Sequence, residues 1–403
     1  MHKLLAILSL SFIICSCAGE EDTDPGSADT FVKLFGGANL DDPQVVVTTP
    51  DGGYLVLATT EIDSVERTLF KIKLIKADEF GNQAWQRIYP ASNEVSYKGR
   101  SLVPYNDGYL IIGDRINPGD EELGSEEETS LLVLGVDQMG ELTGNISNIT
   151  LPSASLQGYG IVPTRSGDLA VVGKISSDTT DNNIFTSRLD GTALQVIDDC
   201  TAQYEANNVD LVKSFFERPD GSLAFAGSIA NGSNGQVFVL PGCQASVLAG
   251  PSLVPGATAS YTVNQLAETT TGLAVVGTTN INNNQDVFFA RLTSLGEQVS
   301  LTVFDDLGPA DDQGLAITTT SDGGFIIGGL TEINTSNEAD LMIRKLNFSG
   351  EVQWTRIYGD LNEEEVRFIQ ETPDGGFVVL GKIEFGGIDN IVLLKTDAQG
   401  NIN

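Results

Sequence analysis

An internal repeat constrains this chain more than any other feature of its sequence. Seven segments share one order of features: an apolar stretch, a glycine-containing turn, a second apolar stretch that ends near glycine, a polar loop, and a third apolar stretch. A period of 50 to 60 residues indicates one supersecondary unit that is copied and stacked on its neighbours. The second apolar stretches begin at Tyr54, Tyr109, Leu169, Leu223, Leu273, Phe325 and Phe377.

The second stretches contain runs such as LVLA, LIIG, AVVG and FVVL, which are apolar at consecutive positions. Strands of this kind are buried on both faces. Asp-Gly and Gly-Gly pairs before them supply the positive φ angles that hairpin turns need. No segment shows a long helical periodicity. We therefore predict an all-β fold, a seven-bladed β-propeller of four-stranded antiparallel blades, over residues 30–403.

The two ends of the chain give a separate indication of this fold. The seventh segment stops at Asp397–Asn403, where its fourth strand is expected to begin. The segment Phe31–Gly37 matches the fourth-strand pattern seen at Trp85–Tyr89 and Trp354–Gly359. We predict that this N-terminal strand completes the last blade and closes the ring, which removes exposed sheet edges.

The pattern T-x-D-G-G-[YF]…G…D…K-L…G…W-x-R-x-Y-G is clearest in the first, sixth and seventh segments. It resembles the β-propeller repeat proteins that are common among bacterial secreted and surface proteins. This resemblance covers about residues 30–403 and implies a fold rather than an activity, because propellers host many functions.

Residues 1–16 have the form of an export signal: a short positive start, then the apolar run Leu4–Ile14. That run is too short to span a membrane. The segment Ile14–Cys17 resembles the lipobox of bacterial lipoproteins, with an aliphatic residue, a permissive position, a small residue and the cysteine. The resemblance implies that Cys17 becomes the acylated first residue and that acyl chains anchor the protein.

Residues 17–29 then form an acidic tether that contains proline and glycine. The stretch Glu20–Asp22 resembles acidic signals that send some lipoproteins to the outside of the outer membrane. We expect an outer-membrane, lipid-anchored protein on the cell surface. A periplasm-facing anchor stays open as the alternative.

The charge balance excludes several function classes. The chain has 22 Lys and Arg against 55 Asp and Glu, a net charge of −33. Bare nucleic acid and anionic lipid surfaces require a basic footprint, so we expect no nucleic-acid partner. The single histidine, His2, lies in the export signal. Ser-His-Asp and Cys-His nucleophiles and histidine-ligated metals are therefore not expected.

Carboxylates precede or open several first strands and are predicted to ring one mouth of the channel. Two such groups could act as general acid and base on a glycoside. Their recurrence from blade to blade favours structural capping or a negative funnel instead. The candidate channel-mouth acids are Asp41, Asp42, Glu94, Asp311, Asp312, Glu363 and Glu364.

The remaining residues of interest give weaker signals. We expect no cofactor, and Ca²⁺ in the oxygen-rich loops is the one alternative kept open. Trp85 and Trp354 occupy equivalent positions, which favours packing between blades over sugar stacking. Whether Cys200 and Cys243 form a disulfide stays open.

Three hypotheses follow for function. The first is a non-enzymatic binding or scaffold module for a neutral or basic protein or glycan. The second is a carboxylate-based carbohydrate-active enzyme, a glycosidase or a lyase. The third is a purely structural component of the envelope.

Overall fold

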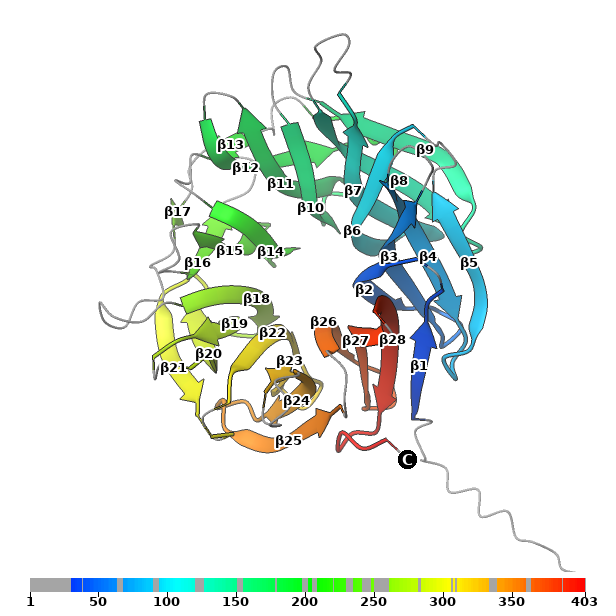
Figure 1. The fold of residues 1–403 in the computed structure, drawn as a ribbon. Helices are drawn as coiled ribbons and strands as arrows, with labels where there is room; N and C mark the ends of the chain where they lie inside the picture. Colours follow the sequence, from blue (N-terminus) through cyan, green and yellow to red (C-terminus); the bar gives the residue numbers. More distant parts are fainter. Residues whose placement is uncertain are drawn as a thin grey trace, which may run out of the picture.

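The computed structural model describes residues 30–402 except 38, 64–67, 90–93, 120–126, 151–154, 178–179, 198–201, 205–208, 220, 230–234, 241–247, 250–260, 282–283, 306, 309, 333–338, 360–363 and 386. Figure 1 shows the strands of this part arranged around a common centre. The described residues contain strands and no helix. Accordingly, no helix among them is long and apolar enough to cross a membrane.

The strands form seven four-stranded sheets, and every pairing is antiparallel. Sheets are numbered here in chain order, and their strands are called first to fourth from the centre outward. Sheet 1 holds β2 (Asp41–Thr48), β3 (Tyr54–Asp63), β4 (Thr68–Ala77) and β5 (Gln83–Tyr89). Sheet 2 holds β6 (Ser96–Tyr105), β7 (Gly108–Asn117), β8 (Glu128–Asp137) and β9 (Leu142–Ile149). Sheet 3 holds β10 (Ser155–Pro163), β11 (Leu169–Ser177), β12 (Thr180–Leu189) and β13 (Ala202–Tyr204).

The other four sheets repeat this order. Sheet 4 holds β14 (Val209–Glu217), β15 (Leu223–Ile229), β16 (Gly235–Leu240) and β17 (Leu248–Ala249). Sheet 5 holds β18 (Tyr261–Thr269), β19 (Gly272–Thr279), β20 (Asp286–Thr293) and β21 (Gln298–Phe304). Sheet 6 holds β22 (Asp312–Thr319), β23 (Phe325–Thr331), β24 (Asp340–Leu346) and β25 (Val352–Tyr358). Sheet 7 holds β26 (Glu364–Glu371), β27 (Phe377–Phe385), β28 (Ile388–Thr396) and β1 (Phe31–Phe35).

The predicted all-β propeller of antiparallel four-stranded blades is confirmed. Its core lies between neighbouring sheets, because the second and third strands bury both faces. In β3, for example, every residue from Tyr54 to Thr60 is buried. One core cluster joins Leu55 and Leu74 of sheet 1 to Ile111 and Leu134 of sheet 2. The consecutive apolar residues of these strands are therefore explained by contacts on two sides.

Strand β1 pairs with β28 although the two are far apart in the sequence. Phe31 lies opposite Lys395 and Phe35 opposite Ile391. Both phenylalanines are buried, at 8% and 6% exposure, whereas Val32 and Leu34 between them are 51% and 54% exposed. The strand thus buries one face in the core that sheets 7 and 1 share.

A recurring set of contacts, here called the joint, connects successive sheets. A lysine near the end of the third strand pairs with an aspartate in the turn between the first and second strands, at 2.9 Å for Lys76–Asp51, 2.8 Å for Lys345–Asp322 and 2.8 Å for Lys395–Asp374. Opposite each lysine, the fourth strand places an aromatic residue. These are Trp85, Trp354 and Phe31.

The aromatic residue of each joint meets a turn of the next sheet. A Cβ on Gly140 would lie 2.6 Å from Trp85, and one on Gly400 would lie 2.7 Å from Trp354. Both glycines also have a φ of 74°, which side chains rarely adopt. The predicted role of Trp85 and Trp354 in packing between blades is confirmed, since both pack against buried core clusters.

The aspartates of the joints have pKa values below the usual range, so they stay charged. Burial raises the pKa of Asp51, but hydrogen bonds from Thr49, Lys76 and Gly53 and the charge of Lys76 outweigh it and lower the pKa to about 2. Burial also raises the pKa of Asp322, but hydrogen bonds from Lys345, Thr320 and Gly324 and the charge of Lys345 outweigh it and lower the pKa to about 2. The pKa of Asp374 is lowered in the same manner beside Lys395.

These aspartates predict an acid-sensitive fold. A carboxylate whose pKa is lower in the folded than in the unfolded chain stabilises the fold above about pH 4, and that contribution is lost as the pH falls toward 2. The triple variant Asp51→Asn, Asp322→Asn, Asp374→Asn should be less stable at pH 7 and lose less stability between pH 4 and 2. Urea unfolding at several pH values measures this, and parallel stability curves for the two proteins would contradict it.

Candidate functional site in the central channel

Each first strand carries a β-bulge at an equivalent position. The pairing with the second strand shifts by one residue there, for example between Pro43 and Val45 and between Val366 and Phe368. A bulge leaves one residue unpaired and redirects its side chain. The seven bulge residues are Gln44, Arg100, Tyr159, Lys213, Asn264, Leu315 and Arg367.

Four of the seven bulge residues line a narrow polar cavity of about 210 Å³, here called the neck. Its lining comes from the first strands of six sheets, as expected for a cavity at the common centre of the strands in Figure 1. The neck is lined among others by Gln44, Arg100, Tyr159, Gln265 and Arg367. Two arginines thus lie close together in a chain whose net charge is −33.

Carboxylates neutralise both arginines of the neck. Arg367 bonds Asp42 of β2 and Glu365 of its own strand, each at 3.1 Å. Arg100 donates from Nε to Asp114 Oδ2 at 2.9 Å. The Arg367–Asp42 pair also joins the first strand of sheet 7 to that of sheet 1.

Asp114 connects the neck to the first strand of sheet 3. Its side chain is 1% exposed, and its Oδ1 accepts the backbone N–H of Gly158 at 2.7 Å. Burial raises the pKa of Asp114, although Arg100 and the Gly158 N–H oppose this shift. The carboxylate therefore depends on these two partners to stay charged in the interior.

A wider recess of about 630 Å³, here called the bowl, adjoins the neck. The two share Ser214, Phe215, Gln265 and Phe368, so they adjoin, and together they are called the channel. Aromatic and aliphatic side chains form much of the wall of the bowl. They are Phe215, Phe216, Leu266, Ile317, Phe368 and Ile369. Glu268 and several threonines complete the bowl.

Three of the predicted channel-mouth acids are buried, and each is the first residue of its strand. Asp41, Asp312 and Glu364 open β2, β22 and β26 and are 1%, 2% and 8% exposed. Asp41 pairs with Lys73 of β4 at 2.7 Å. These three residues lie between strands and do not line the neck or the bowl.

The other candidate acids are dispersed. Asp42 pairs with Arg367 and accepts from Gln44 Nε2 at 2.7 Å, so it lies beside the neck. Asp311 accepts the Gln285 N–H at 2.7 Å, and Glu94 is exposed. Glu363 lies outside the described residues, as do Cys17, Cys200 and Cys243. Asp41 and Asp42 share a separate cavity of about 180 Å³ with Arg100 and Glu61.

The sequence reasoning missed the arginines and phenylalanines of the channel. An alignment of the seven first strands would have shown that Arg100 and Arg367 share one position.

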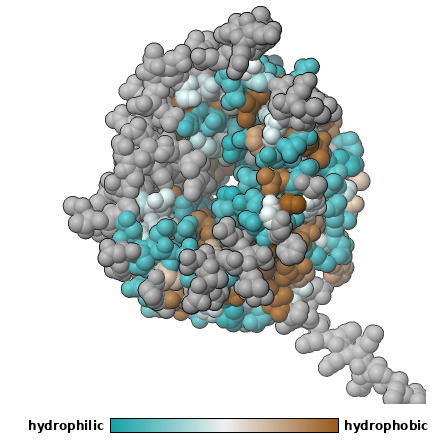
Figure 2. Space-filling view, in the orientation of Figure 1, coloured by the Kyte–Doolittle hydropathy of each residue, from teal (hydrophilic) through white to brown (hydrophobic). Residues whose placement is uncertain are grey.

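In the described residues, no group of three or more His, Cys, Asp or Glu could hold a metal ion. The Ca²⁺ alternative remains a prediction, because the loops that carry it are only partly described. The visible face of the propeller is mainly hydrophilic with scattered hydrophobic residues (Figure 2).

Comparison with solved structures supports the fold. An oligogalacturonate lyase in complex with manganese superposes with a TM-score of 0.50 at 13% identity, covering 91% of this chain and 96% of that one. Prolyl oligopeptidase B from Galerina marginata gives 0.50 at 10% identity over 90% of this chain and 52% of that one. The NanB sialidase from Streptococcus pneumoniae gives 0.45 at 10% identity over 92% and 69%.

At these identities the likeness concerns the β-propeller fold alone. No protein-family model matches the sequence, and no curated protein matches it.

Proposed function

We propose that this protein is an outer-membrane lipoprotein, anchored through Cys17, whose propeller binds a protein or glycan partner at the cell surface without turning it over. The observation that carries this proposal is the bowl, a recess of about 630 Å³ with three phenylalanines in its lining. Aromatic faces pack well against sugar rings and apolar side chains. The net charge of −33 favours a neutral or basic partner.

We propose further that the seven sheets are the blades of one closed ring. Three observations support this: β1 pairs with β28, β2 packs against β26, β27 and β28, and Arg367 of β26 pairs with Asp42 of β2. A closed ring leaves no sheet edge between the first and last blades and gives the bowl a rigid wall.

The binding proposal predicts that replacing phenylalanines of the bowl abolishes partner capture. The double variant Phe215→Ser, Phe368→Ser should lower affinity at least tenfold, because it removes both aromatic faces shared by neck and bowl. The measurement is a pull-down from solubilised membranes together with binding to a panel of neutral oligosaccharides. Phe348→Ser is the matched control, since Phe348 is 47% exposed on a turn and is not among the residues that line the bowl.

Capture that is equal for wild type and double variant would contradict this proposal.

The alternative is a carbohydrate-active enzyme, favoured by Arg100 and Arg367 beside Asp42 and compatible with neighbours that include a lyase and a sialidase. Turnover of any polysaccharide that is lost in Asp42→Asn would establish the alternative. Altered envelope integrity without any partner would favour the purely structural role.

The anchor gives a separate prediction. Cys17→Ser should move the protein from the membrane fraction to the soluble fraction, because acyl chains supply about 0.8 kcal/mol per buried CH₂. Fractionation and mass spectrometry of the N-terminal peptide measure the change, and Cys15→Ser is the control. An unmodified Cys17 in the native host would contradict the proposal.

A further inference from the structure

Sheet 2 lacks two parts of the joint that sheets 1, 6 and 7 share. Gly135 of β8 pairs with Leu110 as Lys76 of β4 pairs with Leu55, so glycine occupies the lysine position. The register shifts between Leu134 and Val136, which places residues 143–145 opposite Gly135. This segment, Thr-Gly-Asn, contains no aromatic residue where sheet 1 has Trp85.

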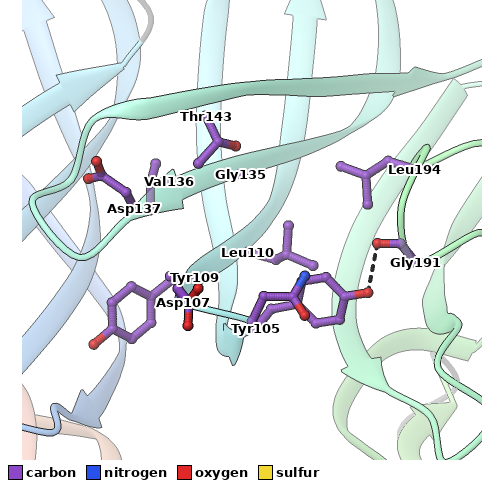
Figure 3. A pocket seen from close by; sticks show the side chains of 12 residues that line it. Tyr105, Asp107, Tyr109, Leu110, Gly135, Val136, Asp137, Thr143, Gly191 and Leu194 are labelled. Atoms are coloured by element: carbon purple, nitrogen blue, oxygen red, sulfur yellow. Dashed lines mark hydrogen bonds between the residues drawn. The ribbon is translucent and has the colours of Figure 1, made fainter.

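The missing side chains leave a cavity of about 230 Å³ between sheets 2 and 3 (Figure 3). Its walls come from the β6–β7 turn, from β8 and β9, and from the turn after β12. A Cβ built on Gly144, in the segment opposite Gly135, would meet nothing within 4 Å. Its lining includes Tyr105, Asn106, Asp107, Gly135, Val136 and Leu194.

The cavity keeps the carbonyl that the lysine uses elsewhere and has a carboxylate beside the position of the joint aspartate. Lys76 Nζ donates to Asp51 and to the carbonyl of Ala77, and Lys345 and Lys395 make the same two kinds of bond. In sheet 2 the carbonyl of Val136 corresponds to that of Ala77, and Asn106 occupies the position of Asp51. The next residue, Asp107, is exposed and lines the cavity, and its carboxylate makes no hydrogen bond or ion pair with another described residue.

The position of the Val136 carbonyl supports this correspondence. A Cβ on Gly53 would lie 2.3 Å from the Ala77 oxygen and 2.6 Å from Lys76 Nζ. A Cβ on Gly108 would lie 2.2 Å from the Val136 oxygen, and none of its three nearest atoms is an amine nitrogen. The carbonyl thus sits above the turn glycine in both sheets.

The walls of this cavity hold unusual backbone conformations. In the described residues, Asn106 and Leu194 are the non-glycine residues with positive φ, at 50° and 53°, and both line the cavity. For leucine such a φ is strained, and strain of this kind clusters at ligand clamps. Tyr105 also donates its hydroxyl to the Gly191 carbonyl at 2.6 Å and ties the two walls together (Figure 3).

We propose that this cavity binds a protonated amine carried on a flat, apolar body. The ammonium takes the place of the missing lysine against Asp107 and the Val136 carbonyl, and the flat body takes the place of the missing aromatic residue. The net charge of −33 favours entry of a cation. The site is separate from the channel, so it does not depend on the function proposed for the bowl.

Tryptamine is a direct probe, because it joins an indole ring to an ammonium group. Calorimetric titration of the full chain in detergent should show tryptamine binding at least tenfold more tightly than tryptophol, its neutral alcohol analogue. Asp107→Asn should lower the affinity for tryptamine about tenfold and leave that for tryptophol unchanged. Asp51→Asn, in the intact joint of sheet 1, is the matched control and should change neither affinity.

Two further arms define the site and its ligand. Gly135→Lys should abolish tryptamine binding, because it restores the lysine that sheets 1, 6 and 7 contain. The affinity for the peptide acetyl-Trp-Lys-amide is compared with that for tryptamine. Tighter binding of the peptide indicates a lysine side chain of a partner protein as the ligand, and tighter binding of tryptamine indicates a small amine. Equal affinities for tryptamine and tryptophol, the absence of saturable tryptamine binding, or an unchanged affinity in Asp107→Asn would overturn the proposal.

Discussion

A chain that begins at Gly37 should be far less stable than one that begins at Thr30, because it lacks β1. The deletion removes Phe31 and Phe35, which are 8% and 6% exposed. Loss of a buried phenylalanine side chain costs about 3–5 kcal/mol. Two such losses approach the whole stability of a typical domain, about 5–15 kcal/mol. The shortened chain should therefore unfold at much lower urea concentration or fail to fold.

Single substitutions separate the contribution of the core from that of chain length. Phe31→Ala and Phe35→Ala should each cost about 3 kcal/mol. The double variant Val32→Ala, Leu34→Ala is the matched control, because these neighbours on the same strand are more than half exposed, at 51% and 54%. If the shortened chain and the longer one unfold at the same urea concentration, β1 does not close the ring.

The second large effect is expected at Asp114. Asp114→Ala should lower the free energy of unfolding by about 3 kcal/mol, because it leaves the Gly158 N–H without its acceptor and Arg100 without its partner. Asp114→Asn should cost less, since an amide oxygen can still accept from Gly158. Urea unfolding at pH 7 measures both changes.

The pH dependence of the Asp114 variants provides a control. Burial raises the pKa of Asp114. The charged carboxylate therefore destabilises the folded protein above that pKa, and this destabilisation disappears as the pH falls and the group is protonated. The stability difference between wild type and Asp114→Asn should therefore vary with pH in the acidic range. Thr59→Ala, at the equivalent position in sheet 1, removes an acceptor for the Gly99 N–H at 3.1 Å and should cost about 1 kcal/mol. An Asp114→Ala cost no larger than that of Thr59→Ala would refute this account.

The sequence predicted the strands well because their signals are local. Glycine turns and consecutive apolar residues lie within each repeat, so β3, β7 and β27 begin where the pattern places them, at Tyr54, beside Tyr109 and at Phe377. The partnership of β1 with β28 was also predicted, from the match between Phe31–Gly37 and the strands that contain Trp85 and Trp354.

The channel could not be predicted in the same way. A bulge reverses the alternation of side chains, so residues on either side of Arg100 or Arg367 face differently than a regular strand would imply. Sequence alone also cannot tell whether a side chain at the start of a first strand faces the axis or the neighbouring sheet. Asp41, Asp312 and Glu364 therefore looked like channel residues and are buried instead.

The loss of the joint in sheet 2 was visible in the sequence but not interpretable there. Gly135 and the segment Leu142–Ile146 read as ordinary drift from the repeat. Only the register of β8 with β9 shows that the lysine and the aromatic residue are missing from the same place. A repeat therefore indicates function where it departs from its own pattern, once the partners of the missing residues are known.

The pairing of β1 with β28 also determines the order of events during synthesis. The ribosome makes Phe31 first, and its partner Lys395 follows only when nearly the whole polypeptide exists. Until then, β1 has no partner strand, and its two phenylalanines lack the part of their core that sheet 7 supplies. Contacts of such long sequence separation form slowly. Sheet 7 can therefore be completed only after β26, β27 and β28 have been made.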